Sequence, residues 1–118
     1  MLYYKKGVKM SYYEQRADSK KYFHFRRSEQ ISTNPHFHSA LEFLFVESGE
    51  QEVIIGGEKR VLKAGDACFV NGFCVHAYPN VTNARTIVIV GDKRHFDSAL
   101  SAFNNKKPPT FFRFEQVE

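Results

Sequence analysis

The chain has 118 residues, enough for one hydrophobic core and too few for a second globular unit. Hydrophobic residues at 42% and charged residues at 25% exclude a disordered chain and a disulfide scaffold. The formal charge is +4, yet the basic residues of the first quarter match no groove-reading motif, so we expect this chain itself to bind no nucleic acid.

Cysteine content and apolar runs indicate the compartment. Two cysteines are too few for a disulfide framework, and the N-terminus lacks the apolar core of a signal peptide. We therefore expect a cytoplasmic protein. No stretch reaches the apolar length that spans a bilayer, so we expect no contact with a membrane.

The chain divides into three predicted regions. Residues 1–21 form an N-terminal arm, residues 22–90 a β-domain, and residues 91–118 a short helix followed by a linker and tail. Twelve Phe and six Tyr favour strands, and turn signals separate short apolar runs as in a barrel or sandwich. The predicted strands are 22–26, 36–47, 51–55, 58–62, 67–70, 75–78 and 85–90.

Two glycine signals mark predicted hairpins. Gly56-Gly57 suits a tight turn whose two central residues need positive φ, and Asn71-Gly72 is a similar signal. Beyond the last strand, Asp92 is placed to cap a helix that continues to Phe103, with apolar residues spaced at three and four. Pro108-Pro109 then favours an extended linker.

Three of the five histidines occur with a glutamate in a fixed pattern. His36 and His38 are two apart and share a face of the predicted strand, and Glu42 keeps the same parity. A barrel would bring a later strand with His76 alongside. Three imidazoles and one carboxylate suit Zn, Fe, Ni, Mn or Co, and six-fold coordination would leave two positions for water or ligand.

Residues 35–80 resemble the two sequence motifs of the cupin family. The first motif, HxHxxxExxxxxxG, is matched by His36, His38, Glu42 and Gly49. An upstream glycine of that motif is replaced by Gln30.

The second motif, GxxxxxPxGxxHxxxN, is matched in part. Gly65, His76 and Asn80 fit, whereas Asn71 stands for the proline and Phe73 for the glycine. These departures concern the turn and leave the metal ligands intact. The resemblance is closest to the sensor domain of AraC-type transcription regulators and covers about half of the chain.

The resemblance implies an all-β cupin jelly-roll β-barrel with a short C-terminal helix. It implies a domain that binds a small effector, often a sugar, and signals to a DNA-binding domain outside this chain. The predicted ligand-binding residues are His36, His38, Glu42, His76 and Tyr78, the first four of which are the metal ligands. The alternative is a small metal-dependent cupin enzyme, a dioxygenase or isomerase, and we favour the sensor because candidate acids and bases are few.

Apolar side chains also predict self-association. Leu41, Phe43 and Phe45 should face outward if Glu42 faces the pocket, and the predicted helix adds a second apolar stripe. The N-terminal arm could cover part of this surface, or a two-fold partner could do so. We expect a homodimer.

Overall fold

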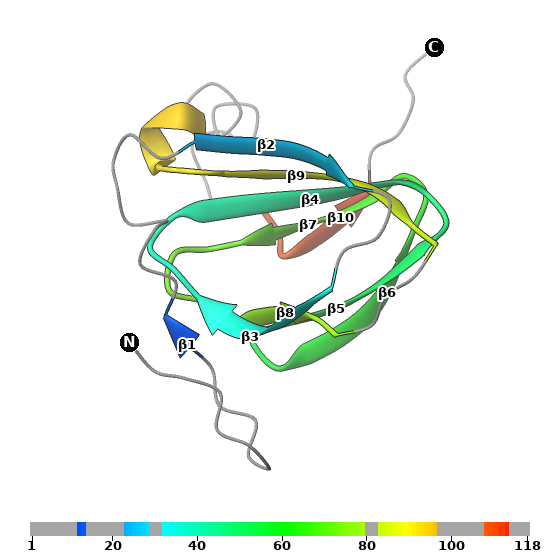
Figure 1. Cartoon of the computed structure of the whole chain (residues 1–118), viewed down its shortest axis with the longest axis horizontal. Helices are drawn as coiled ribbons and strands as arrows, with labels where there is room; N and C mark the ends of the chain where they lie inside the picture. The colour runs from blue at the N-terminus through cyan, green and yellow to red at the C-terminus, as the bar shows by residue number, and fades with distance from the viewer. Residues whose placement is uncertain (1–11, 14–22, 29–31, 80–82, 97–107, 114–118) are drawn as a thin grey trace.

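The computed structural model describes residues 12–13, 23–28, 32–79, 83–96 and 108–113, which form ten strands and one short 3-10 helix (Figure 1). The elements are β1 (Tyr12–Tyr13), β2 (Phe23–Ser28), β3 (Thr33–Phe37), β4 (Leu41–Ser48), β5 (Glu50–Ile55), β6 (Glu58–Lys63), β7 (Asp66–Val70), β8 (His76–Tyr78), β9 (Arg85–Gly91), η2 (Lys93–Phe96) and β10 (Phe111–Arg113).

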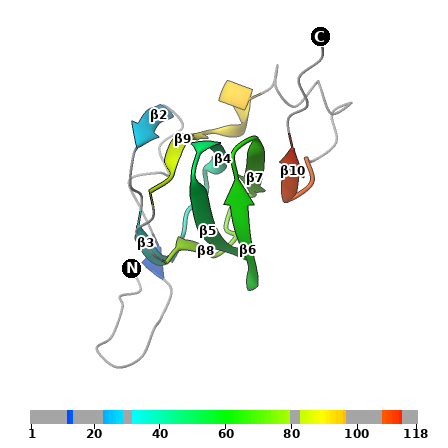
Figure 2. The same ribbon diagram turned by 90° about the vertical axis from the view of Figure 1, so that its right-hand side faces the viewer.

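The strands form two five-stranded sheets that face each other (Figure 2). One sheet has the order β1-β3-β8-β5-β6 and the other β10-β7-β4-β9-β2. The all-β prediction is confirmed. No strand in the described part of the chain belongs to both sheets, so the closed barrel that we expected is not seen there.

Strand β4 is the centre of the second sheet and is buried on both faces. Its inner face carries Leu44, which lies in the cluster between the two sheets. Its outer face carries Leu41 and Phe43, which pack in a second cluster with Phe69 and Phe96. The predicted outward direction of Leu41 and Phe43 is therefore right, but the chain itself covers them.

Cover for this outer face comes from the last strand and the 3-10 turn. Strand β10 pairs antiparallel with β7, within the segment predicted as linker and tail, and Phe112 contacts both Phe43 and Phe45 edge-on. Phe96 packs against Phe43 with ring centroids 5.3 Å apart. Sequence reasoning did not predict β10, because a strand of three residues is too short to leave a periodic signal.

The single strand predicted over 36–47 is wrong, since this run consists of β3 and β4 in different sheets. The chain bends at Ser39 and Ala40. The carbonyl of His38 accepts a hydrogen bond from the Phe73 amide at 2.7 Å, so this backbone group is bonded to the β7–β8 loop. The bend lets one short segment supply side chains to both sheets.

The two predicted hairpins differ in outcome. Gly56 and Gly57, with φ of 56° and 85°, close the β5–β6 hairpin as expected. Asn71-Gly72 instead lies in a connection from β7 to β8 in the other sheet, and the positive φ of 63° falls on Phe73. Phe73, which stands where the second motif has glycine, therefore adopts a left-handed backbone that glycine accommodates most readily.

The predicted C-terminal helix is not confirmed. Asp92 does cap a turn, because its carboxylate accepts the Arg94 amide at 3.0 Å, but that turn is the 3-10 helix Lys93–Phe96. The remainder to Phe103 lies outside the described residues, as does most of the predicted arm. Among the described residues, no helix is long and apolar enough to cross a membrane.

Candidate metal centre

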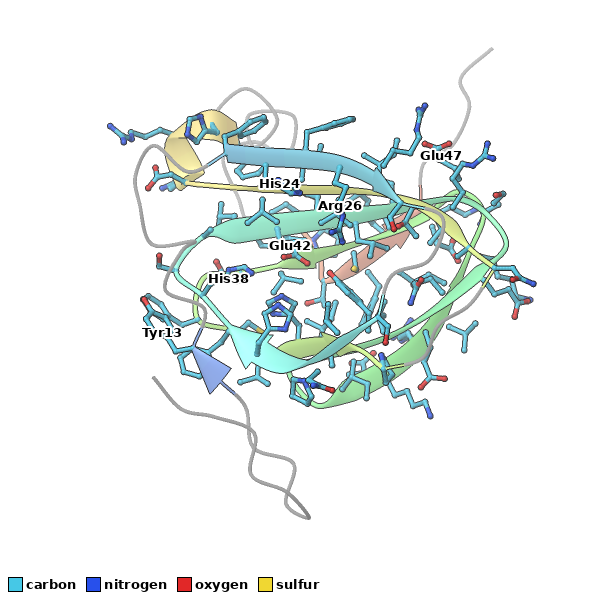
Figure 3. The ribbon with its side chains drawn as sticks, viewed as in Figure 1. Tyr13, His24, Arg26, His38, Glu42 and Glu47 are labelled. Atoms are coloured by element: carbon cyan, nitrogen blue, oxygen red, sulfur yellow. The ribbon has the colours of Figure 1, made fainter. Side chains whose placement is uncertain are left out.

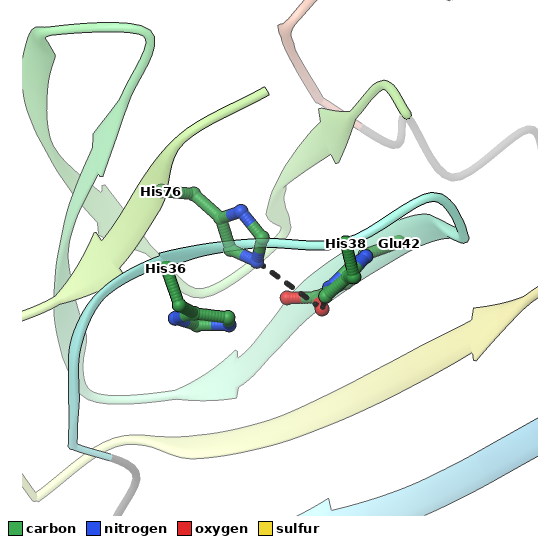
Figure 4. A group of neighbouring side chains, drawn as sticks. All are labelled: His36, His38, Glu42 and His76. Carbon is green, nitrogen blue, oxygen red and sulfur yellow. Dashed lines mark hydrogen bonds and ion pairs between the residues drawn. The ribbon is translucent and has the colours of Figure 1, made fainter. Parts of the chain in front are cut away.

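Four buried side chains meet between the two sheets (Figure 4). His36 lies on β3, His38 just after it, Glu42 on β4 and His76 on β8. Their candidate ligand atoms all lie within 4.8 Å of one another. His36 and His76 are direct partners in the β3–β8 ladder, with ring centroids 4.1 Å apart.

Each imidazole is oriented by a backbone carbonyl. The Nδ1 atoms of His36, His38 and His76 lie 2.8, 3.0 and 2.9 Å from the carbonyl oxygens of residues 34, 40 and 74 respectively. A carbonyl oxygen can only accept, so each Nδ1 carries a hydrogen and donates it. In the neutral ring, Nε2 is then left with a lone pair, the form in which histidine binds a metal.

Glu42 is 3% exposed and faces the imidazoles. Its Oε1 lies 3.1 Å from His38 Nε2 and 3.4 Å from His76 Nε2. Burial alone would raise the pKa of Glu42, but the interactions with His38 and His76 outweigh it and hold that pKa well below the usual range. The carboxyl group is therefore ionised at neutral pH.

Tyr78 holds the other oxygen of this carboxylate. The tyrosine is 1% exposed and donates its hydroxyl hydrogen to Glu42 Oε2. Burial, together with the charge of Glu42, raises the pKa of Tyr78 well above 10. This hydrogen bond fixes Glu42 so that Oε1 points to the histidines.

The donor set fits a metal cation. With Nδ1 protonated, the lone pairs of His38 Nε2 and His76 Nε2 face a carboxylate oxygen, so acceptor faces acceptor unless a positive charge lies between them. His76 Nε2 is fully buried and has no hydrogen-bond partner, an arrangement that costs free energy in an apolar interior. A divalent ion would satisfy all these atoms at once.

The structure brings together the four predicted metal ligands, but not by the expected route. The sequence predicted that Glu42 shares one strand face with His36 and His38. In the structure Glu42 lies on the opposite sheet and faces them across the core. Tyr78, the fifth predicted ligand-binding residue, lies inside the core against Glu42. The three orienting carbonyls left no sequence signal, because any residue can supply one.

Two facing sheets thus enclose a buried cluster of three histidines and one glutamate that could hold a divalent metal ion. The family model described as Cupin domain matches residues 23–90, and the chain belongs to this family. No curated protein matches it significantly.

Several solved structures are similar to this chain at low sequence identity. A Cupin 2 conserved barrel domain protein from Salinispora arenicola is 18% identical, with a TM-score of 0.47 over 71% of this chain and 75% of that chain. A cupin protein from Bacteroides fragilis is 18% identical (TM-score 0.46, 59% and 64%). A mutant of salicylate 1,2-dioxygenase from Pseudoaminobacter salicylatoxidans is 17% identical (TM-score 0.48, 81% and 26%). Likenesses at this level carry no information on substrate or activity.

Proposed function

We propose that the chain is a small-molecule sensor domain of an AraC-type transcription regulator, whose effector binds at a divalent transition metal held by His36, His38, Glu42 and His76. DNA contact is then made by a separate domain. The metal centre in this proposal rests above all on the buried Nε2 of His76, which lacks a hydrogen-bond partner and faces an ionised carboxylate. Only a cation or an added proton relieves that arrangement. The sensor role rests on the resemblance of residues 35–80 to the sensor domains of AraC-type regulators.

Each residue has a defined part in this binding function. The Nε2 atoms of the three histidines and Oε1 of Glu42 would hold the ion, while the three carbonyls and Tyr78 keep these donors in place. A bound divalent ion supplies a Lewis acid that attracts an oxygen donor of the effector.

Binding is favoured over catalysis by the state of the remaining titratable groups near the centre. Tyr78 donates to Glu42 and has a raised pKa, so it is a poor proton donor or base near neutral pH. Burial, with the charge of Glu42, also raises the pKa of the Cys68 thiol, which makes it a poor nucleophile. The described part of the centre thus offers metal ligands and no poised acid or base.

A metal-dependent cupin enzyme, a dioxygenase or isomerase, is the second candidate. Its support is the complete ligand set, since a sensor could hold an effector without a metal. The two functions differ in what happens to a bound molecule.

The test combines metal content with the fate of a ligand. Untagged protein is incubated with Zn or Ni, desalted and analysed for metal, and we expect about one ion per chain, lost in His76→Ala and kept in the exposed His95→Ala control. Sugars and organic acids that raise the thermal stability of the loaded protein are then followed by NMR. A sensor returns them unchanged. Protein without metal would overturn the metal centre, and steady conversion of a ligand would establish the enzyme instead.

A further inference from the structure

The register of the second sheet places an arginine on the face that carries the metal centre. Arg26 on β2 pairs with Val88 on β9, and Val88 pairs with Leu44 on β4. Directly paired residues of an antiparallel sheet project to the same side, so Arg26 shares the inner face with Leu44 and with Glu42 two residues earlier. Figure 3 shows Arg26 and His24 on β2, above Glu42 and His38.

Arg26 combines an inward direction with exposure to water. Strand β2 is the edge of its sheet, and Arg26 is exposed although the paired Val88 and Leu44 are buried. Two strand spacings separate β2 from β4, about 10 Å. A long arginine side chain on the edge strand can therefore approach the centre while remaining accessible to an incoming molecule.

The guanidinium of Arg26 makes no hydrogen bond or ion pair with another described residue. The next residue, Arg27, points to the opposite face, where its Nε donates to Glu47 Oε1 at 2.9 Å. Of two adjacent arginines, only the one on the inner face thus lacks an acidic partner.

Charge balance at the centre favours an anion. Glu42 is the only buried acidic side chain among the described residues, and three neutral histidines add no charge. A divalent ion held by these four groups leaves a net charge of +1, and Arg26 adds another. The planar guanidinium donates two parallel hydrogen bonds to a carboxylate or phosphate, geometry that suits oxyanions better than neutral hydroxyls.

We propose that Arg26 binds an oxyanion group of the small molecule held at the metal centre, so that the effector is an organic acid or phosphate ester with a second oxygen donor for the metal. His24 lies two residues before Arg26 on the same face of β2, in register with Val90 and Glu42. It would therefore lie beside the path by which the small molecule reaches the metal centre. The inference rests on the proposed binding function and narrows its ligand from small molecules in general to anionic ones.

Calorimetric titration of the Zn-loaded chain tests this inference with four probes: succinate, glycerol 3-phosphate, and their neutral counterparts succinamide and glycerol. We expect at least one anion to bind more tightly than its neutral counterpart, and Arg26→Gln to weaken that anion roughly 10- to 100-fold. Arg26→Lys should retain part of the affinity because it keeps the charge. Arg27→Gln is the matched control, adjacent in sequence and on the other face, and should bind like wild type.

The outcomes separate this inference from the metal centre. Metal content is measured on every variant before titration. Loaded protein that does not prefer either anion, or an Arg26→Gln variant that binds it as well as wild type, overturns the role of Arg26 while the metal centre stands. Equal weakening by Arg27→Gln also overturns it, since the effect would then be one of overall charge. If the protein holds no metal, the proposed function fails, and the same titration of metal-free protein decides whether Arg26 selects anions by itself.

Discussion

At the scale of single residues, Glu42 is the group on which the centre depends. A buried carboxylate without partners would cost several kcal/mol. Glu42 accepts the Tyr78 hydroxyl hydrogen, and the imidazoles of His38 and His76 stabilise it when a cation or a proton lies between their Nε2 atoms and Oε1. The same contacts lower its pKa, so the charge that could hold a cation also contributes to folding.

The pH dependence of stability should reveal this contribution. Because the pKa of Glu42 is lowered in the folded state, its stabilising effect is complete above its ordinary value of 4.5 and is lost as the pH falls below it. We expect metal-free wild type to exceed Glu42→Gln in free energy of unfolding by roughly 1–3 kcal/mol at pH 5. Urea unfolding should show this difference shrinking toward pH 3. A difference that stays constant or grows over that interval would contradict the assignment.

At the scale of strands and turns, the first cupin motif ends on a glycine for a steric reason. Gly49, between β4 and β5, has φ of 77°, and a Cβ there would lie 2.8 Å from the backbone oxygen of Asn83. Gly57 has a similar φ of 85°, yet a Cβ would meet nothing within 4 Å. The two positions therefore separate backbone strain from crowding.

Alanine at these two glycines should have unequal effects. Gly57→Ala adds only left-handed strain, about 1–2 kcal/mol. Gly49→Ala adds the clash as well and should cost roughly 3 kcal/mol or more, because backbone must shift to admit the methyl group. Denaturant unfolding of both variants measures the difference. Equal losses of unfolding free energy in the two variants would show that the backbone at Asn83 shifts at little cost. Glycine would then be needed at position 49 only for its positive φ.

The strands themselves were largely predictable, and their assignment to sheets was not. Alternation and turn residues indicated β5, β6, β7 and β9 to within a residue or two of each end. No local pattern reveals that the chain changes sheet at residues 38–40, because the bend is fixed by a hydrogen bond to Phe73 far along the chain. The four candidate metal ligands were recognisable from spacing and resemblance, whereas the place of Tyr78 against Glu42 depends on tertiary packing.

At the scale of the whole molecule, the apolar rows that suggested a dimer are partly accounted for. Phe43 is covered within the chain by Phe96 and Phe112. The same outer face continues across β9 to β2, where Phe23 and Phe25 are 51% and 58% exposed. Two large aromatic side chains on an edge strand remain an apolar patch of the kind that marks interfaces.

We still predict a homodimer, now through the outer face of β2. Light scattering at micromolar concentration should return twice the chain mass for wild type and the monomer mass for Phe25→Ser. Val61→Ser, at an exposed position on β6 in the other sheet, should leave the dimer intact. A wild-type monomer throughout that range, or a dimer unaffected by Phe25→Ser, would exclude this interface.

X-ray absorption spectroscopy of the Ni- or Zn-loaded chain tests the central claim most directly, because the fine structure counts the imidazoles around the ion. The structure predicts three imidazole ligands with oxygen completing the shell, and two imidazoles or loss of the metal in His76→Ala. A spectrum without imidazole scattering, or one that His76→Ala leaves unchanged, would contradict the assignment of His36, His38, Glu42 and His76 as a metal centre.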